Sequence, residues 1–91
     1  SEVLKSYEKL DYVFFDGNHQ KQPTIEYFDK CLKKSHENSI FIFDDIHWSN
    51  EMEEAWNHIQ SHPLVTCSID IFWIGIVFFK KDQPKENYVI R

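Results

Sequence analysis

The sequence predicts an α/β fold with a mostly parallel sheet that contains one reversed strand. Short apolar runs alternate with amphipathic segments of about a dozen residues, which is the spacing of parallel strands joined by helices. The last two apolar runs are separated by only a short connection, so they must be antiparallel. The chain has 91 residues, of which 42% are hydrophobic and 16% aromatic. We therefore expect a single domain, residues 1–91, with a real core.

Four apolar runs predict strands. The first two, at 11–16 and 40–43, lack polar alternation, which is typical of strands covered on both faces. The other two span 65–70 and 74–80, and a tight turn joins them. The polar tail from Lys81 is expected to lie on the surface.

Three segments with apolar residues at helical spacing predict helices. Residues 1–10 are expected to be the end of a helix. The second helix is expected over 23–36, with a proline at its first position. The third is expected to begin at Ser49 or Asn50, because Asn50 and Glu53 have the spacing of a capping box.

The composition argues against several classes of partner and location. The net charge is −5 and no Lys/Arg cluster occurs, so nucleic acid and anionic membranes would not attract this chain. No secretory signal, lipidation motif or apolar span of about 18 residues is present. Cys31 and Cys67 lie far apart and have no metal-type spacing, which is typical of reduced thiols. We expect a cytoplasmic protein.

The first predicted strand has no neighbour on its outer side. An apolar edge strand presents unpaired backbone groups and promotes aggregation unless another segment covers it. No proline or inward-pointing charge protects the YVFF run at 12–15. We therefore expect either that the chain forms a homo-oligomer through this edge, or that it is the C-terminal part of a larger domain whose N-terminal half covers the edge.

Acidic residues stand at the ends of three predicted strands. Asp16 ends the first, Asp44 and Asp45 end the second, and Asp70 ends the third. In open α/β sheets, ligands bind at the carboxyl ends of the strands. A divalent cation prefers oxygen ligands and would offset the repulsion among Asp16, Asp44 and Asp45. The alternative is that these acids cap helices or accept backbone N–H bonds in their loops.

The loops beside these acids carry histidines and aromatic residues. His19 is a candidate general base, with Asp16 as its partner acid, and the alternative is an exposed loop histidine. Four more residues on these loops are candidate substrate contacts, although loop packing onto the sheet is the alternative for the three aromatic ones. The candidate substrate contacts are His47, Trp48, Phe72 and Trp73.

Three stretches together resemble the C-terminal half of a class I S-adenosylmethionine-dependent methyltransferase. They are LDYVFFDGNH, SIFIFDDIHWS and TCSIDIFWIGIVFFKK, and they cover the chain from about Leu10 to Lys81. The sequence is similar to the O-methyltransferase-like group with an Asp-Gly-x-His motif after the fourth strand and paired acids after the fifth. The resemblance implies a partial Rossmann-like methyltransferase sheet with strands in the order 4-5-7-6, strand 7 antiparallel, and helices on the sheet faces.

The resemblance also implies an activity and its ligands. It implies methyl transfer from S-adenosylmethionine to the oxygen of a small molecule, with Mg²⁺ held by Asp16, Asp44 and Asp45 and orienting the acceptor hydroxyl. His19 would be a base or a substrate contact. The glycine-rich turn and the acid that hold most of the cofactor in this family are absent from this sequence, which contains only Gly17 and Gly75. A missing N-terminal half would therefore bind most of the S-adenosylmethionine.

Two other functions remain open at this point. A non-catalytic assembly module would use the uncovered edge of the first strand to pair with another chain. A metal-dependent hydrolase would use the same three acids to hold its metal ion.

Overall fold

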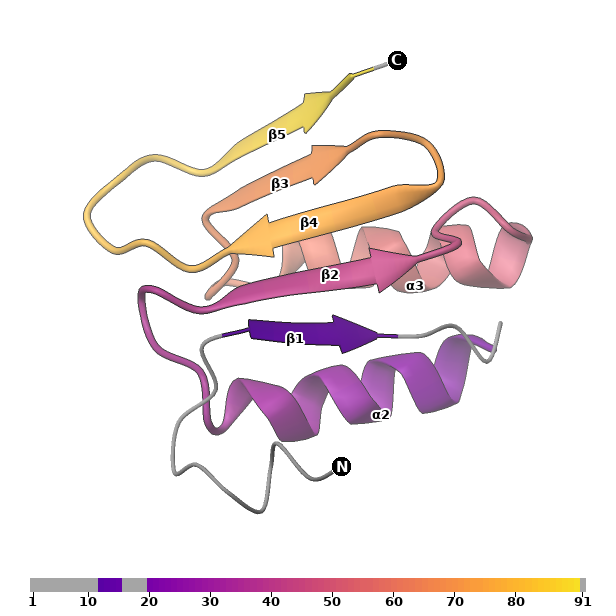
Figure 1. The fold of residues 1–91 in the computed structure, drawn as a ribbon, viewed down its shortest axis with the longest axis horizontal. Coiled ribbons are helices and arrows are strands. Elements are labelled where there is room, and N and C mark those ends of the chain that lie inside the picture. The colour runs from indigo at the N-terminus through magenta and orange to yellow at the C-terminus, as the bar shows by residue number, and fades with distance from the viewer. Residues whose placement is uncertain (1–11, 16–19, 91) are drawn as a thin grey trace.

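A five-stranded mixed sheet and two helices make up the computed structural model (Figure 1), which describes residues 12–15 and 20–90. This architecture confirms the α/β prediction. The strands are β1 (Tyr12–Phe15), β2 (Ile40–Asp44), β3 (Cys67–Asp70), β4 (Ile74–Phe78) and β5 (Glu86–Val89). The helices are α2 (Lys21–Leu32) and α3 (Asn50–Ser61).

The strand order across the sheet is β1-β2-β4-β3-β5. Strand β1 pairs with β2 in parallel, and β3 pairs with β5 in parallel. Strand β4 lies between β2 and β3 and is antiparallel to both. It is the one reversed strand that the short β3–β4 connection predicts.

Strand β5 is absent from the sequence prediction, which assigned the tail after Lys81 to the surface. The tail is indeed exposed throughout β5, so it offers no alternation of buried and exposed residues to indicate a strand. Its position on β3 is fixed by polar contacts instead. The buried Ser68 hydroxyl donates to Asn87 Oδ1 at 2.6 Å and accepts from Gln60 Nε2 at 2.9 Å.

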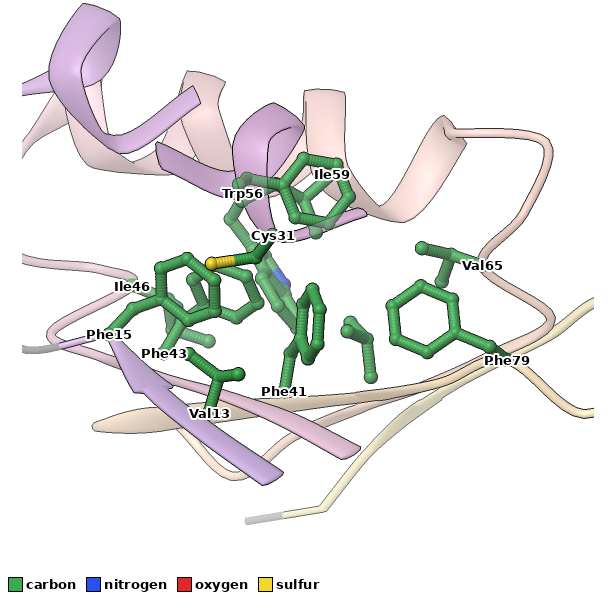
Figure 2. Packing of buried hydrophobic residues seen from close by; sticks show 12 residues of the cluster. Val13, Phe15, Cys31, Phe41, Phe43, Ile46, Trp56, Ile59, Val65 and Phe79 are labelled. Atoms are coloured by element: carbon green, nitrogen blue, oxygen red, sulfur yellow. The ribbon is translucent and has the colours of Figure 1, made fainter. Parts of the chain in front are cut away.

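Both helices cover the same face of the sheet, and the core lies between them and the strands (Figure 2). The register brings Val13, Phe41 and Val77 into one row on this face. Consecutive right-handed crossovers that step in the same direction across a sheet put their helices on one face. The chain steps from β1 through β2 to β3 in this way, which explains why α2 and α3 share a face.

The prediction that the first two strands are covered on both faces is wrong for the described part of the chain. Burial alternates along β1 and β2, and Tyr12 and Phe14 are 57% and 48% exposed. The opposite face of the sheet is nonetheless apolar. One row that crosses all five strands on this open face consists of Phe14, Ile42, Ile76, Ile69 and Tyr88.

The core is largely aromatic. Phe15 and Phe43 stack with their ring centroids 4.2 Å apart, and Phe28 packs against Phe43 at 5.9 Å. The ring of Trp56 lies directly on the backbone of Gly75, where a Cβ atom would come within 2.6 Å of Trp56 Cζ3. Only glycine leaves room for this contact. It joins α3 to the start of β4.

The helix ends differ slightly from the prediction. Helix α2 begins at Lys21, so Pro23 is its third residue, where a missing N–H still costs no intrahelical bond. It ends at Leu32 rather than near residue 36. Ser49 caps α3 by accepting from the Met52 N–H at 3.2 Å. The predicted helix over 1–10 lies outside the described residues.

Both cysteines are free; Cys31 is buried in the core, and Cys67 is half-buried on the open face. Neither of the helices within the described residues is long and apolar enough to span a membrane.

Candidate functional site

The candidate site lies at the carboxyl ends of β2 and β3, which point the same way in the sheet (Figure 1). Two segments form it: the loop from β2 to α3 and the turn from β3 to β4. The backbone N–H of Asp45 donates to the carbonyl of Trp73 at 2.7 Å, so the two segments are joined directly. Asp16 and His19, the predicted catalytic pair, lie outside the described residues.

Asp70 is the centre of this site. Asp70 is only 5% exposed, and its two carboxylate oxygens bind different segments of the chain. Oδ1 accepts from the backbone N–H of Phe72 at 2.8 Å, and Oδ2 lies 2.7 Å from His47 Nε2. A buried carboxylate requires such partners, because an unpaired charge in the interior costs several kcal/mol. Asp70 therefore holds the β3–β4 turn and the β2–α3 loop together.

His47 lies between two carboxylates. Its Nε2 faces Asp70, and its Nδ1 lies 2.9 Å from Oε2 of Glu53 on α3. Burial lowers the pKa of His47, but the hydrogen bonds and charges of Asp70 and Glu53 outweigh it, so the pKa is raised overall. Both nitrogens donate only when the imidazole is protonated, which is why this arrangement favours the imidazolium.

Two residues of the site have left-handed backbone conformations. Asp45 has a φ of 57° and Phe72 a φ of 75°. Asp tolerates this region, but it is strained for a residue as bulky as phenylalanine. The hydrogen bond from the Phe72 N–H to Asp70 offsets that strain. Strained backbone that is held in place by its surroundings is typical of binding and catalytic sites.

Three of the four predicted substrate contacts present aromatic surface at this end of the sheet. Trp48 and Trp73 are 59% and 64% exposed, and Phe72 is 40% exposed. The ring of Phe72 stacks on the imidazole of His47 at 5.5 Å, and it meets Trp73 edge-on at 4.8 Å. His47, Phe72 and Trp73 thus form one continuous group, and the β2–α3 loop adds Trp48. Each of these rings therefore packs through part of its surface and leaves the rest open to solvent.

The predicted metal ligands are only partly described. Asp44 and Asp45 are adjacent at the end of β2. The alternation along β2 places Asp44 on the open face, whereas Asp70 continues the helix-covered face of β3. Within residues 12–15 and 20–90, no three His, Cys, Asp or Glu side chains are arranged to hold a metal ion. The two carboxylates are suitable donors for Mg²⁺, and the predicted set needs Asp16 to be complete.

The described residues do not form a cradle for a nucleoside cofactor. Gly75 is the only glycine among them, and Trp56 occupies the space above it. A glycine-rich turn needs exposed backbone N–H groups that a ligand can approach. Most of the binding energy for S-adenosylmethionine would therefore have to come from polypeptide outside these residues.

The sequence places Asp70 at this edge but indicates no role for it, and it assigns Glu53 to a capping box rather than to the site. In the structure the Glu53 side chain turns to His47 instead. The available signal was Asp70 itself, an acid at a position that strand alternation directs toward the core. Nothing in the spacing of Glu53 from His47 distinguishes it from an ordinary helix acid.

Comparison of the chain with protein-family models, with curated proteins and with solved structures gives no match. The geometry of the carboxyl edge and the sequence motifs are therefore the basis for inferring a function.

Proposed function

We propose that this chain forms the acceptor-binding part of an S-adenosylmethionine-dependent methyltransferase that transfers a methyl group to an oxygen of a small molecule. The observation that carries the proposal is the order of the first four strands. The order β1-β2-β4-β3, with β4 reversed, supports the 4-5-7-6 arrangement that the resemblance implies, and β5 adds a further strand beyond β3, where that arrangement ends. A reversed strand between two strands that run the same way is uncommon in α/β sheets, so this feature is more specific than the fold class alone.

The location of the candidate site supports the same function. The acids and aromatic residues lie at the carboxyl ends of parallel strands, where α/β enzymes bind ligands. Exposed rings of Trp48 and Trp73 offer apolar surface to an organic acceptor. Asp44 and Asp45, with Asp16, would hold a divalent cation, which lowers the pKa of a bound hydroxyl and orients it.

Calorimetry tests this proposal. The longest natural protein that contains these residues is titrated with S-adenosylmethionine and S-adenosylhomocysteine, with and without Mg²⁺. We expect binding of both nucleosides. Heat with neither of them would contradict the methyltransferase assignment. Binding of Mg²⁺ without any response to the nucleosides would favour the metal-dependent hydrolase.

A pair of matched variants tests the role of the acids. Asp44→Asn is expected to weaken the effect of Mg²⁺ without unfolding the protein. Asp29→Asn, on the exposed surface of α2, is the control and should behave like the wild type. Equal responses of the two variants to Mg²⁺ would remove Asp44 from the proposed metal site.

The open sheet face favours a second candidate function, that of an assembly module. Tyr12 and Phe14 on β1 continue into an apolar surface across β2, β4 and β3, and no described element covers it. Exposed apolar patches larger than a few hundred Å² mark interaction surfaces. Analytical ultracentrifugation distinguishes this function: Ile76→Lys on the open face should abolish association, whereas Asn57→Lys on the outer surface of α3 should not.

A further inference from the structure

Asp70 and Glu53 hold the same imidazole but differ in how firmly they are themselves held. The Asp70 side chain is 7% exposed and the Glu53 side chain is 47% exposed. Asp70 is also fixed through its backbone, because its carbonyl accepts from the Ile90 N–H at 2.8 Å and its Oδ1 accepts from Phe72. Glu53 extends from the first turn of α3 into solvent. Of the two partners of His47, only Glu53 can move away at little cost.

The imidazole ring is fixed on its face as well as at Nε2. Phe72 stacks on it with an interplanar angle of 25°, and the Phe72 backbone is tied to the same Asp70 carboxylate. One buried acid thus sets both the direction of Nε2 and the position of the ring that packs on the imidazole. Since Nε2 points inward to Asp70, Nδ1 is the nitrogen that faces the solvent-accessible side, where Glu53 now lies.

We propose that Asp70 is a positioning residue that holds His47 with Nδ1 directed at the acceptor, and that the acceptor's hydroxyl takes the place of Glu53 at Nδ1. The inference rests on the proposed function, because it takes the ligand to be a hydroxyl compound. Phe72 and Trp73 then supply the apolar surface beside this hydrogen bond. Glu53 occupies the position only while no ligand is bound.

Because the two carboxylates have different roles, we expect their removal to have opposite effects on the affinity for the ligand. Removing Glu53 removes a competitor for Nδ1, so Glu53→Ala should tighten ligand binding. Removing the Asp70 charge loosens both His47 and Phe72, so Asp70→Asn should weaken it. A purely structural role for both acids would make both substitutions harmful or neutral.

The test uses phenol as the probe and toluene as its counterpart without an oxygen atom to accept from Nδ1–H. Binding is followed by NMR through the imidazole signals of His47 and the indole N–H of Trp73. Phenol is expected to shift both sets of signals, and toluene to shift the Trp73 signal alone. For phenol, we expect Glu53→Ala to bind several-fold more tightly and Asp70→Asn about tenfold more weakly, as for the loss of one hydrogen bond that involves a charge.

Glu54→Ala is the matched control, because Glu54 is the next residue of the same helix and pairs with Lys21 at 2.9 Å instead of with a histidine. It should leave phenol binding unchanged. Asp70→Glu, which keeps the charge, should recover part of the affinity that Asp70→Asn loses. If Asp70→Asn does not fold, His47→Gln replaces it in the test and should also weaken phenol binding about tenfold.

Three results would overturn the inference: equal effects of Glu53→Ala and Glu54→Ala, unchanged phenol binding in Asp70→Asn or His47→Gln, or equal shifts of His47 with phenol and toluene. These results do not depend on S-adenosylmethionine. The calorimetric test of the methyltransferase assignment can therefore fail while the positioning role stands, and the reverse also holds.

Discussion

At the carboxyl end of the sheet, the segments after β2 and β3 contain two residues at positive φ, a buried carboxylate and a paired histidine. At the opposite end, the loops at 33–39 and 62–66 contain no residue with positive φ, and the β4–β5 loop contains one, Asp82, with a φ of 63°. Aspartate tolerates this region of backbone conformation. The loop at 33–39 is closed locally, since Ser39 and His36 exchange two hydrogen bonds of 2.9 Å. Among the described residues, only the carboxyl end therefore combines a bulky residue at positive φ, Phe72, with a buried carboxylate.

The α3–β3 loop at the opposite end is stabilised by one long side chain. Lys85 Nζ donates to the carbonyls of His62 and Val65 at 2.9 and 2.6 Å. Burial lowers the pKa of Lys85. Here a charge binds two loop carbonyls, of which that of His62 also accepts from the Val65 N–H at 3.0 Å. At the carboxyl end, Asp70 instead holds exposed aromatic residues in a strained turn. The costly conformation, that of Phe72, thus lies at the end where α/β sheets bind ligands, and a buried acid holds it there.

The largest effect on stability is expected at the point that anchors the carboxyl end to the core. Gly75→Ala puts a methyl group into the ring of Trp56, and the free energy of unfolding should fall by about 3 kcal/mol, the upper range for overpacking. Trp56→Phe removes the ring atoms involved, and the Trp56 indole N–H has no hydrogen-bond partner among the described residues to lose. In urea denaturation, the double variant should lose much less than the sum of the single losses. Additive losses would contradict the close contact.

A pH-dependent effect is expected at His47. Its pKa is raised in the folded state, so its stabilisation is fully present below the ordinary histidine pKa of about 6.5 and is lost as the pH rises through the folded value. His47→Gln should cost about 1–2 kcal/mol near pH 5.5 and clearly less near pH 8.5. His58→Gln, at an exposed position on α3, is the control. A cost that does not change with pH would argue against the paired imidazolium.

The opposite end should respond without this pH dependence. Lys85→Met removes two hydrogen bonds to carbonyls but keeps most of the aliphatic chain, and it should lower the free energy of unfolding by about 1 kcal/mol. Phenol binding, measured as above, should stay at the wild-type value. A change in phenol binding would show that the two ends are coupled and would break the distinction between them.

The smallest effect on stability is expected at Phe72. Phe72→Gly relieves the positive φ, worth about 1 kcal/mol, and removes ring contacts of similar size with His47 and Trp73. Thermal unfolding should therefore change little, while phenol binding should be lost. A large drop in stability would mean that Phe72 is a core residue rather than part of a binding surface.

The sequence predicted the order of the main elements well, because hydrophobic periodicity determined them. The spacing of Met52, Ala55, Trp56 and Ile59 predicted α3, and all four are buried. The short connection between Asp70 and Ile74 predicted the reversed strand β4. Strand β5 could not be predicted in this way, because its four residues are all exposed and polar contacts position it.

The site was predictable only as a location. Strand-end acids and loop aromatics indicated the carboxyl edge, but the pairing of His47 with Asp70 spans 23 positions of sequence and depends on the β3–β4 turn. Local spacing also gave the wrong partner for Glu53, since a capping box and a contact with His47 use the same residue. Tertiary contacts decided between them.

Hydrogen exchange of the longest natural protein containing these residues, with and without phenol, tests most directly whether the carboxyl end is the ligand-binding end. We expect slower exchange of the backbone amides in residues 44–48 and 70–74 when phenol is bound, and no change in residues 33–39 and 62–66. Slower exchange confined to the latter two loops, or no change anywhere in the chain, would contradict it.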